Sequence, residues 1–245
     1  MMKLTPWLKT NKVELTSRLM IGTEQYNSAE MIRDVTIAAG AELLIATINP
    51  KDRSSGVAIA DVARAFEKKD YKCVNVSTTS FVYSAQEAID TALKMRDLFD
   101  IEFVKLDVRN DVKQRWANNF DVIEAAEVLL RKGFDVMPMI TPDPYAAMKL
   151  QDMGCCALRL SAGELGTGKG IYNFEAMENV RSVVSIPCIG ETGIINVTEV
   201  TQLFGIGMDA VLVNSAIAQA SKPIEMATAM RLAVESSLCY KNATL

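Results

Sequence analysis

The sequence predicts a single (β/α)8 barrel, and three observations carry this prediction. The chain has 245 residues, a length that fits one α/β barrel domain. Short apolar runs rich in β-branched residues alternate with longer amphipathic segments between residues 18 and 241. Such alternation implies parallel strands joined by right-handed crossovers. A doubly wound open sheet would show the same local pattern, and it is the count of eight runs that favours closure into a barrel.

The eight predicted strands are short and mostly apolar, as expected for strands that are buried on both faces. Residues 1–16 precede the first of them and are interpreted as an N-terminal extension of one domain that spans residues 1–245. In chain order the predicted strands are Arg18–Thr23, Glu42–Ile48, Lys72–Val76, Glu102–Val108, Phe134–Ile140, Cys156–Leu160, Ile186–Gly190 and Ala210–Asn214.

Capping residues indicate where helices begin and end between these strands. Ser28 begins the first helix, the box Ser84-Ala-Gln-Glu87 begins the third, and Asp143-Pro144 begins the fifth. Glycines that relax a left-handed turn are expected to close three helices, at Gly133, Gly154 and Gly207. The remaining helices are predicted at Val57–Lys69, Phe120–Lys132, Phe174–Val183, Val197–Gly207 and Pro223–Tyr240.

The composition excludes several classes of function. The net charge is −4 and no run of Lys and Arg is present, which argues against nucleic-acid binding. The chain has no histidine, so catalytic triads, general bases and metal sites that need histidine are excluded. Residues 1–12 lack the apolar core of a signal peptide, and no apolar run approaches the roughly 20 residues of a membrane span, so we expect a cytoplasmic protein. The five cysteines show no CxxC spacing and are expected to be core residues: Cys73, Cys155, Cys156, Cys188 and Cys239.

Two charged residues lie on the predicted fourth strand. Lys105 and Asp107 are two positions apart, so both side chains point to the same face. Charges on a central barrel strand would not face the packed helices, and we therefore expect both to point into the barrel. Burial favours the neutral form of a lysine, which can attack a carbonyl carbon. A Lys–Asp pair can also merely fill the barrel, but buried ion pairs stabilise weakly and more often mark a site.

A glycine-rich segment, Ser161-Ala-Gly-Glu-Leu-Gly-Thr-Gly-Lys-Gly170, follows the predicted sixth strand. Its glycines, Gly166 among them, allow backbone N–H groups to converge on an anion. Residues 163–169 also match the start of a nucleotide P-loop, but Gly170 replaces the hydroxyl residue that would bind Mg²⁺, which argues against that motif. The alternative is an ordinary glycine-rich turn that binds no ligand.

The ends of the seventh and eighth strands, Gly190-Glu-Thr-Gly193 and Val213-Asn-Ser-Ala216, supply the other candidates. In barrels of this kind the loops after these strands, together with the N-terminus of a short helix, form a recurring phosphate site. Residues 215–218 are the candidate for that helix. Glu191, at the tip of the seventh strand, would face the barrel mouth and act as an acid or base; the alternative is a solvated loop carboxylate.

In these segments the sequence resembles the bacterial thiazole synthase family of thiamin biosynthesis, over nearly the whole chain. The resemblance implies a (β/α)8 barrel enzyme that joins 1-deoxy-D-xylulose 5-phosphate, an iminoacetate and sulfur from the C-terminal thiocarboxylate of a small ubiquitin-like sulfur-carrier protein. It also implies a homo-oligomer that requires no metal and no cofactor. The similarity is densest in Ser17-Arg-Leu-Met-Ile-Gly-Thr23, Val104-Lys-Leu-Asp107, Gly166-Thr-Gly-Lys-Gly170 and Gly207-Met-Asp-Ala-Val-Leu-Val-Asn-Ser-Ala-Ile-Ala218.

The resemblance also assigns site residues. The Schiff-base lysine of the family falls on Lys105. Two family carboxylates, a Glu after the lysine and an Asp on the seventh strand, fall on Asp107 and Glu191, so one has lost a methylene and the other has gained one. The family's sugar-phosphate contacts fall on Gly166, Thr192, Gly193, Asn214 and Ser215.

Other departures from the family also lie at strand ends that face the substrate, whereas the helices match better. A Gly-Lys-Tyr after the first strand reads Glu24-Gln25-Tyr26, and a paired Arg after the second is replaced near Asn49-Pro50. An Asn-Thr-Ala-Gly after the third strand reads Thr78-Thr-Ser-Phe81, and a Pro after the sixth is replaced around Glu164. The lysine and the phosphate contacts are kept while the groups around the sugar change.

Several functions remain open on this basis. In a thiazole-synthase-like enzyme, Lys105 would form an imine with the phosphosugar ketone while Asp107 and Glu191 move protons. A paralogous 2-thiosugar synthase would thiolate another sugar phosphate by the same imine chemistry, and the altered strand ends favour it. A catalytically silent barrel would only scaffold a sulfur carrier, and the presence of Lys105 argues against it. A phosphosugar aldolase or isomerase is compatible with the fold alone.

Overall fold

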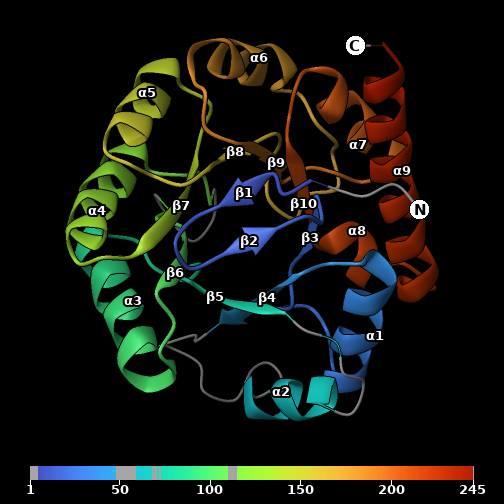
Figure 1. Cartoon of the computed structure of the whole chain (residues 1–245), viewed down its shortest axis with the longest axis horizontal. Coiled ribbons are helices and arrows are strands. Elements are labelled where there is room, and N and C mark those ends of the chain that lie inside the picture. The colour runs from blue at the N-terminus through green and yellow to red at the C-terminus, as the bar shows by residue number, and fades with distance from the viewer. Residues whose placement is uncertain (1–4, 48–58, 68–70, 72, 110–114, 245) are drawn as a thin grey trace.

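Eight parallel strands form a nearly closed barrel in the computed structural model, which describes residues 5–47, 59–67, 71, 73–109 and 115–244 (Figure 1). The strands follow one another in the order β3-β10-β9-β8-β7-β6-β5-β4. At the seam, Thr23 Oγ1 donates to Ile45 O of β4 at 2.9 Å. The predicted (β/α)8 barrel is confirmed. Its strands are β3 (Leu19–Ile21), β4 (Leu43–Thr47), β5 (Val74–Thr78), β6 (Phe103–Leu106), β7 (Asp135–Ile140), β8 (Leu158–Ser161), β9 (Cys188–Glu191) and β10 (Ala210–Val213).

A ring of helices surrounds the barrel (Figure 1). The predicted caps are confirmed, because Ser28, Ser84 and Asp143 each accept a hydrogen bond from a backbone N–H of the following turn. The glycines at 133, 154 and 207 have positive φ, as predicted. The helices are α1 (Ala29–Ala39), α2 (Ile59–Glu67), α3 (Ala85–Phe99), α4 (Asn119–Arg131), α5 (Pro144–Asp152), α6 (Phe174–Val183), α7 (Val197–Gly205), α8 (Ser215–Ala218) and α9 (Pro223–Thr244).

Side chains alternate along each strand between two apolar clusters. On β8, Leu158 and Leu160 belong to the cluster between the strands and the helices, whereas Ala157, directly before β8, belongs to a cluster inside the barrel. The inner cluster also contains Met20, Phe103, Met137, Ile189 and Leu212. The N-terminal half of the barrel interior is therefore filled by apolar side chains, as is usual for this fold.

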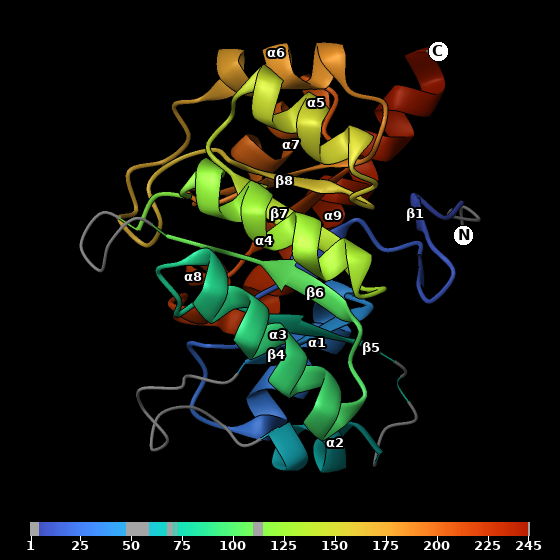
Figure 2. The ribbon, with the colours of Figure 1, turned by 90° about the vertical axis from the view of Figure 1, so that its left-hand side faces the viewer.

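A small hairpin closes the N-terminal end of the barrel. It consists of β1 (Leu8–Lys9) and β2 (Glu14–Leu15), which pair antiparallel. Trp7, Leu8, Val13 and Leu15 are buried in the inner cluster, so the segment predicted as an extension packs into the barrel. Figure 2 shows this hairpin at the end of the barrel opposite to α8. The other end, where strands finish, is left for the site.

Most observed strands end one or two residues away from their predicted ends, and the ends of β5 and β6 have a clear physical cause. β5 continues through Ser77 and Thr78, because these residues pair with β6 and Ser77 Oγ donates to Phe103 O at 3.2 Å. β6 ends at Leu106 rather than Val108, because the next backbone N–H, that of Asp107, donates to Thr79 Oγ1 at 2.8 Å instead of a strand partner. Positions 57, 58, 68, 69 and 72 of the predicted elements, position 48 and the departure at 49–50 lie outside the described residues.

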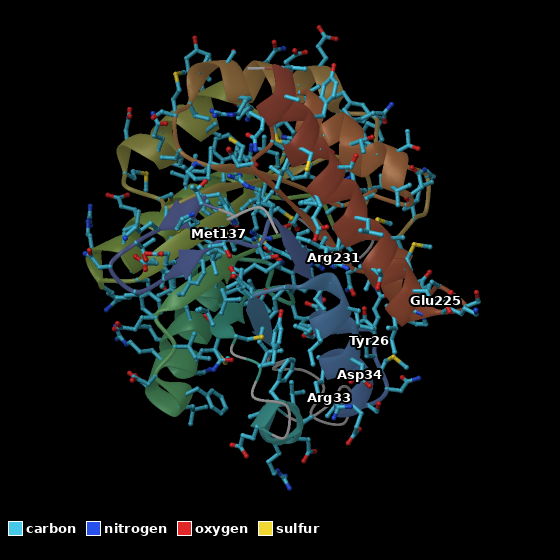
Figure 3. All side chains as sticks on the ribbon, turned by 45° about the vertical axis from the view of Figure 1, so that its right-hand side comes forward. Tyr26, Arg33, Asp34, Met137, Glu225 and Arg231 are labelled. Atoms are coloured by element: carbon cyan, nitrogen blue, oxygen red, sulfur yellow. The ribbon has the colours of Figure 1, made fainter. Side chains whose placement is uncertain are left out.

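The long C-terminal helix α9 packs against α1 and completes the ring (Figure 3). Arg231 of α9 joins the two helices, since its Nε donates to Ala38 O at 3.0 Å. The helix extends to Thr244, four residues beyond the predicted end. Within the described part of the chain, no helix combines the length and apolar character needed to cross a membrane.

Candidate active site

A cavity of about 230 Å³ lies at the carboxyl ends of β8, β9 and β10. Three successive loops contribute to it, as expected for the site-bearing face of this fold. Lys105 and Asp107 do not line this cavity; they lie on β6 and directly after it, and β7 separates β6 from β8. Six residues singled out in the sequence do line it: Gly166, Glu191, Thr192, Gly193, Asn214 and Ser215.

Close backbone packing shapes one wall of the cavity. Gly193 has a φ of 77°, and a Cβ there would lie 2.8 Å from Gly170 O and 2.9 Å from Gly163 Cα, so only glycine fits. Thr192 has a φ of 63°, which is uncommon for a residue other than glycine. Its hydroxyl donates to Gly163 O at 2.6 Å and so holds the two loops together. What Thr192 offers a ligand is therefore its backbone rather than its hydroxyl.

The opposite wall is the start of α8, the short helix predicted after β10. Asn214 and Ser215 are both contacted by the loop after β3: Asn214 Nδ2 donates to Glu24 Oε2 at 3.3 Å, and Gln25 Nε2 donates to Ser215 Oγ at 2.9 Å. A Cβ on Gly22 would lie 2.5 Å from Asn214 Cγ, so this glycine makes room for the asparagine. Glu24 and Gln25, which replace other residues of the family, thus contact Asn214 and Ser215, two predicted phosphate ligands.

Lys105 and Asp107 form a buried ion pair inside the barrel. Lys105 Nζ donates to Asp107 Oδ2 at 2.8 Å, and Ser80 Oγ donates to the same oxygen at 2.9 Å. The Arg109 guanidinium lies 3.7 Å from it. Lys105 is 5% exposed and Asp107 is fully buried, so the prediction that both point into the barrel is confirmed.

A third buried charge, which the sequence analysis did not identify, joins this pair to the cavity. Arg159 of β8 is fully buried and forms ion pairs with Asp107 Oδ1 and, at 2.7 Å, with Glu191 Oε2. Glu191 is 3% exposed, so the alternative of a solvated loop carboxylate is wrong. A continuous chain of charges therefore runs from the cavity through Glu191, Arg159 and Asp107 to Lys105.

Electrostatics favour the charged forms of Asp107 and Arg159. Burial opposes ionisation of Asp107, but the positive charges of Arg159, Lys105 and Arg109 outweigh it and hold the pKa of Asp107 well below its ordinary value. Burial likewise opposes the charge of Arg159, yet Asp107 and Glu191 raise the pKa of Arg159 above its ordinary value. Counted by formal charge, Lys105, Arg109 and Arg159 outnumber the two carboxylates by one, and this excess of basic residues suits an anionic ligand.

The pattern that identified Lys105 also applies to Arg159. In Leu158-Arg-Leu160 a charged residue stands between two leucines that face the helices, so its side chain must enter the barrel. The contacts made by Glu24 and Gln25, in contrast, depend on how two loops meet and leave no periodic signal in the sequence.

The prediction that all five cysteines are core residues is wrong for Cys239, which is exposed on α9, whereas Cys155 and Cys188 are buried. Burial raises the pKa of both the Cys155 and Cys188 thiols to about 12, so neither is a nucleophile near neutral pH. In the described ranges, which omit 48–58 and 110–114, no group of His, Cys, Asp and Glu is arranged to bind a metal ion.

Comparison with known proteins places this geometry in a family. The family described as "Thiazole biosynthesis protein ThiG" matches residues 9–244. The thiazole synthase of Aquifex aeolicus is 34% identical, over 91% of this chain and 83% of its own length. The thiazole synthase of Gluconacetobacter diazotrophicus is also 34% identical, over 94% and 89%.

A solved structure agrees with these sequence matches. The crystal structure of the Amycolatopsis orientalis BexX/CysO complex contains a chain that is 36% identical and superposes with a TM-score of 0.92, covering 98% of this chain and 97% of the other. The chain therefore belongs to the ThiG thiazole biosynthesis family.

Proposed function

We propose that this protein is a thiazole-synthase-like enzyme that builds thiazole phosphate for thiamin. In this proposal, Lys105 forms an imine with the ketone of 1-deoxy-D-xylulose 5-phosphate, and sulfur comes from a carrier-protein thiocarboxylate. The observation that carries it is a buried lysine at the end of β6, joined by a chain of charges to a cavity at the same barrel rim. Membership of the family and 34% identity to two thiazole synthases support it.

The cavity wall is suited to the phosphate of the substrate. Gly166 and Gly193, both with positive φ, and the backbone of Thr192 bring main chain close to a bound anion. Asn214 and Ser215 add the start of α8, and helix N-termini favour negative charge. We assign these five residues as phosphate ligands.

Lys105 is the nucleophile of the proposed reaction. Its neutral amine would attack the ketone carbon; the C–N bond forms, the C–O bond breaks, and the carbonyl oxygen leaves as water with the two amine hydrogens. One proton from solvent then gives the protonated imine. Asp107, which remains ionised, would stabilise the positive charge of the protonated imine 2.8 Å away. Glu191, which lines the cavity, is the carboxylate placed to move protons on the bound sugar.

The proposed reaction also needs a protein partner. A small ubiquitin-like sulfur carrier would bring its C-terminal thiocarboxylate to the barrel mouth. The similar structure from Amycolatopsis orientalis is a complex of two proteins, BexX and CysO, which supports a protein partner here. Assembly into a homo-oligomer and a cytoplasmic location are part of the same proposal.

A specific contact favours a second candidate, a paralogous 2-thiosugar synthase that acts on another sugar phosphate. Glu24 and Gln25 reach across the rim to Asn214 and Ser215, so they alter the surroundings of the bound sugar while Lys105 is unchanged. Barrel enzymes change substrate through such loop residues. A non-catalytic scaffold would have no use for the buried charges at Lys105, and an aldolase or isomerase is supported by the fold alone.

Borohydride trapping followed by mass spectrometry tests the proposal. Wild-type protein is incubated with a panel of phosphosugars and reduced, and the modified residue is located by peptide mapping. An adduct on Lys105 with deoxyxylulose 5-phosphate is expected, and an adduct only with a hexose phosphate would indicate the 2-thiosugar reaction. The matched control is Lys169→Ala, because Lys169 lies in the glycine-rich rim loop but is exposed and paired with Glu164. If no sugar labels Lys105 and Lys105→Ala retains activity, both enzymatic proposals fail.

A further inference from the structure

Arg159 has more contacts than a buried charge needs for neutrality. Its Nε donates to Met137 O at 3.1 Å, one terminal nitrogen donates to Glu191, and the other donates to Leu106 O at 2.9 Å and to Asp107. Met137 belongs to β7, Leu106 to β6 and Glu191 to β9. One guanidinium therefore links β8 to three other strands, β6, β7 and β9, at the level of the proposed site.

These contacts divide the oxygens of Asp107 between partners. Arg159 takes Oδ1, and this leaves Oδ2 to Lys105 Nζ at 2.8 Å and Ser80 Oγ at 2.9 Å, with Arg109 3.7 Å away. The backbone of Asp107 is held as well, since its N–H donates to Thr79 Oγ1 at 2.8 Å. The carboxylate cannot rotate without breaking one of these contacts. Arg159 thus sets the position of the Lys105 amine through Asp107, without contacting the amine itself.

The planar fork of arginine is what makes the arrangement possible. Arginine presents five N–H donors in a rigid plane, and four of the contacts above use that plane at once. A lysine at the same place could supply the charge but not the two separate carboxylate contacts together with two carbonyl contacts. The charge and the geometry of Arg159 can therefore be separated by substitution.

We propose that Arg159 is a positioning residue that fixes Asp107 and Glu191 on either side of it and thereby sets the placement and the charge state of the Lys105 amine. The catalytic importance of this role rests on the proposed imine chemistry, whereas the role itself can be tested without any sugar. The charged and titratable groups around Asp107 are Lys105 of β6, Arg109 after β6 and Arg159 of β8, with Glu191 of β9 reached through Arg159.

Removal of the cation has a definite consequence for the lysine. In Arg159→Met two buried carboxylates remain against two cations, so the surroundings of Lys105 become more negative and favour the ammonium form. The pH at which the amine reacts half-maximally should rise by about one unit or more. In Arg159→Lys the charge is kept, so this midpoint should stay near that of wild type. The rate of Lys105 labelling should still fall by about tenfold or more, because lysine lacks the planar fork of the guanidinium and the Lys105 amine is then misplaced.

Competitive acetylation provides the readout without any sugar. The protein is labelled with trace acetic anhydride across a pH series, and acetylation of Lys105 is quantified by mass spectrometry against exposed lysines. The same series is repeated by borohydride trapping with the phosphosugar. The matched control is Arg181→Met. Arg181 also donates to backbone carbonyls, those of Gly207 and Val184, but it lies near the end of α6, where the chain leads into the start of β9, at the other end of the barrel.

The outcomes separate this inference from the proposed function. The positioning role is supported if the pH midpoint of Lys105 acetylation rises in Arg159→Met but stays at the wild-type value in Arg159→Lys and in Arg181→Met. If acetylation shows this pattern but wild type gives no sugar adduct, the positioning role stands and the imine proposal fails. An unchanged midpoint in a folded Arg159→Met overturns the inference. If that variant does not fold, a wild-type rate of Lys105 labelling in Arg159→Lys overturns it instead.

Discussion

The two halves of the barrel interior are built on opposite principles. The N-terminal half is apolar: Met20, Phe103, Met137 and Ile189 fill it, and the hairpin that carries Leu15 closes it. The C-terminal half, one or two residues further along the same strands, contains Lys105, Arg159 and Glu191 with Asp107, all buried and all paired. The change from apolar to charged occurs within single strands, as from Phe103 to Lys105 on β6.

This difference separates stability from chemistry within one scaffold. Apolar packing is non-directional and tolerates conservative exchange. A buried charge network depends on every member, because a carboxylate or guanidinium left without its partner has no water to replace it. The N-terminal half can therefore hold the strands in place while the C-terminal half fixes a few side chains in one geometry. The following predictions test that contrast.

The largest effect is expected from Asp107→Asn. The substitution removes the carboxylate shared by Lys105, Arg109 and Arg159 and leaves buried cations uncompensated, which should lower the free energy of unfolding by about 3–5 kcal/mol. Urea denaturation followed by circular dichroism measures this change. The control is Asp61→Asn, since the exposed Asp61–Arg64 pair should be worth only about 0–1 kcal/mol. Equal losses in the two variants would show that burial adds nothing to the network.

A smaller effect is expected at the rim, where geometry rather than charge is decisive. Gly193→Ala forces a side chain into a left-handed conformation against Gly170 O and Gly163 Cα, and should cost about 1–3 kcal/mol of stability. Affinity for inorganic phosphate, measured by isothermal titration calorimetry, should fall at the same time. Gly205→Ala is the control, because nothing lies within 4 Å of a Cβ at that position of α7. Unchanged phosphate affinity in Gly193→Ala would remove the rim from the proposed phosphate site.

How much of this could be predicted from the sequence differs between the two halves as well. Strand alternation was sufficient to place Lys105 and Asp107 inside the barrel, since a period of two leaves only two faces. The same argument fits Arg159, because it stands between Leu158 and Leu160, which face the helices. The predicted rim residues do meet in one cavity, because the fold gathers strand ends at one face.

Other features had no local signal. The pairing of Glu24 with Asn214 and of Gln25 with Ser215 joins residues 190 positions apart, and no periodicity reports such a contact. The fixing of the Asp107 backbone by the Thr79 hydroxyl, which ends β6 early, is equally non-local. Side-chain contacts between loops are set by the tertiary structure, and propensity or pattern in one segment does not determine them.

Acid should weaken the charged half and leave the apolar half unaffected. The folded-state pKa of Asp107 lies below its ordinary value, so its contribution is fully present above the unfolded pKa of about 3.9 and is lost as the pH falls further towards the folded pKa. Wild type should therefore lose up to about 1.4 kcal/mol per pH unit more than Asp107→Asn below that point. Urea denaturation of both proteins at a series of pH values from about 5 to about 2.5 measures this difference in the free energy of unfolding. Parallel curves for the two proteins would mean that Asp107 is not held ionised.

The smallest effect is expected from Ile189→Val in the apolar half. Ile189 is fully buried and pairs in register with Arg159 on the next strand, so it is an apolar residue of the inner cluster that lies next to the network. Loss of one methylene should cost about 0.5–1.5 kcal/mol and should not change with pH, because no charge is involved. The midpoint of Lys105 acetylation should also remain that of wild type. Should this variant move that midpoint, packing beneath the network would also set the lysine, and the two halves of the barrel would not act independently.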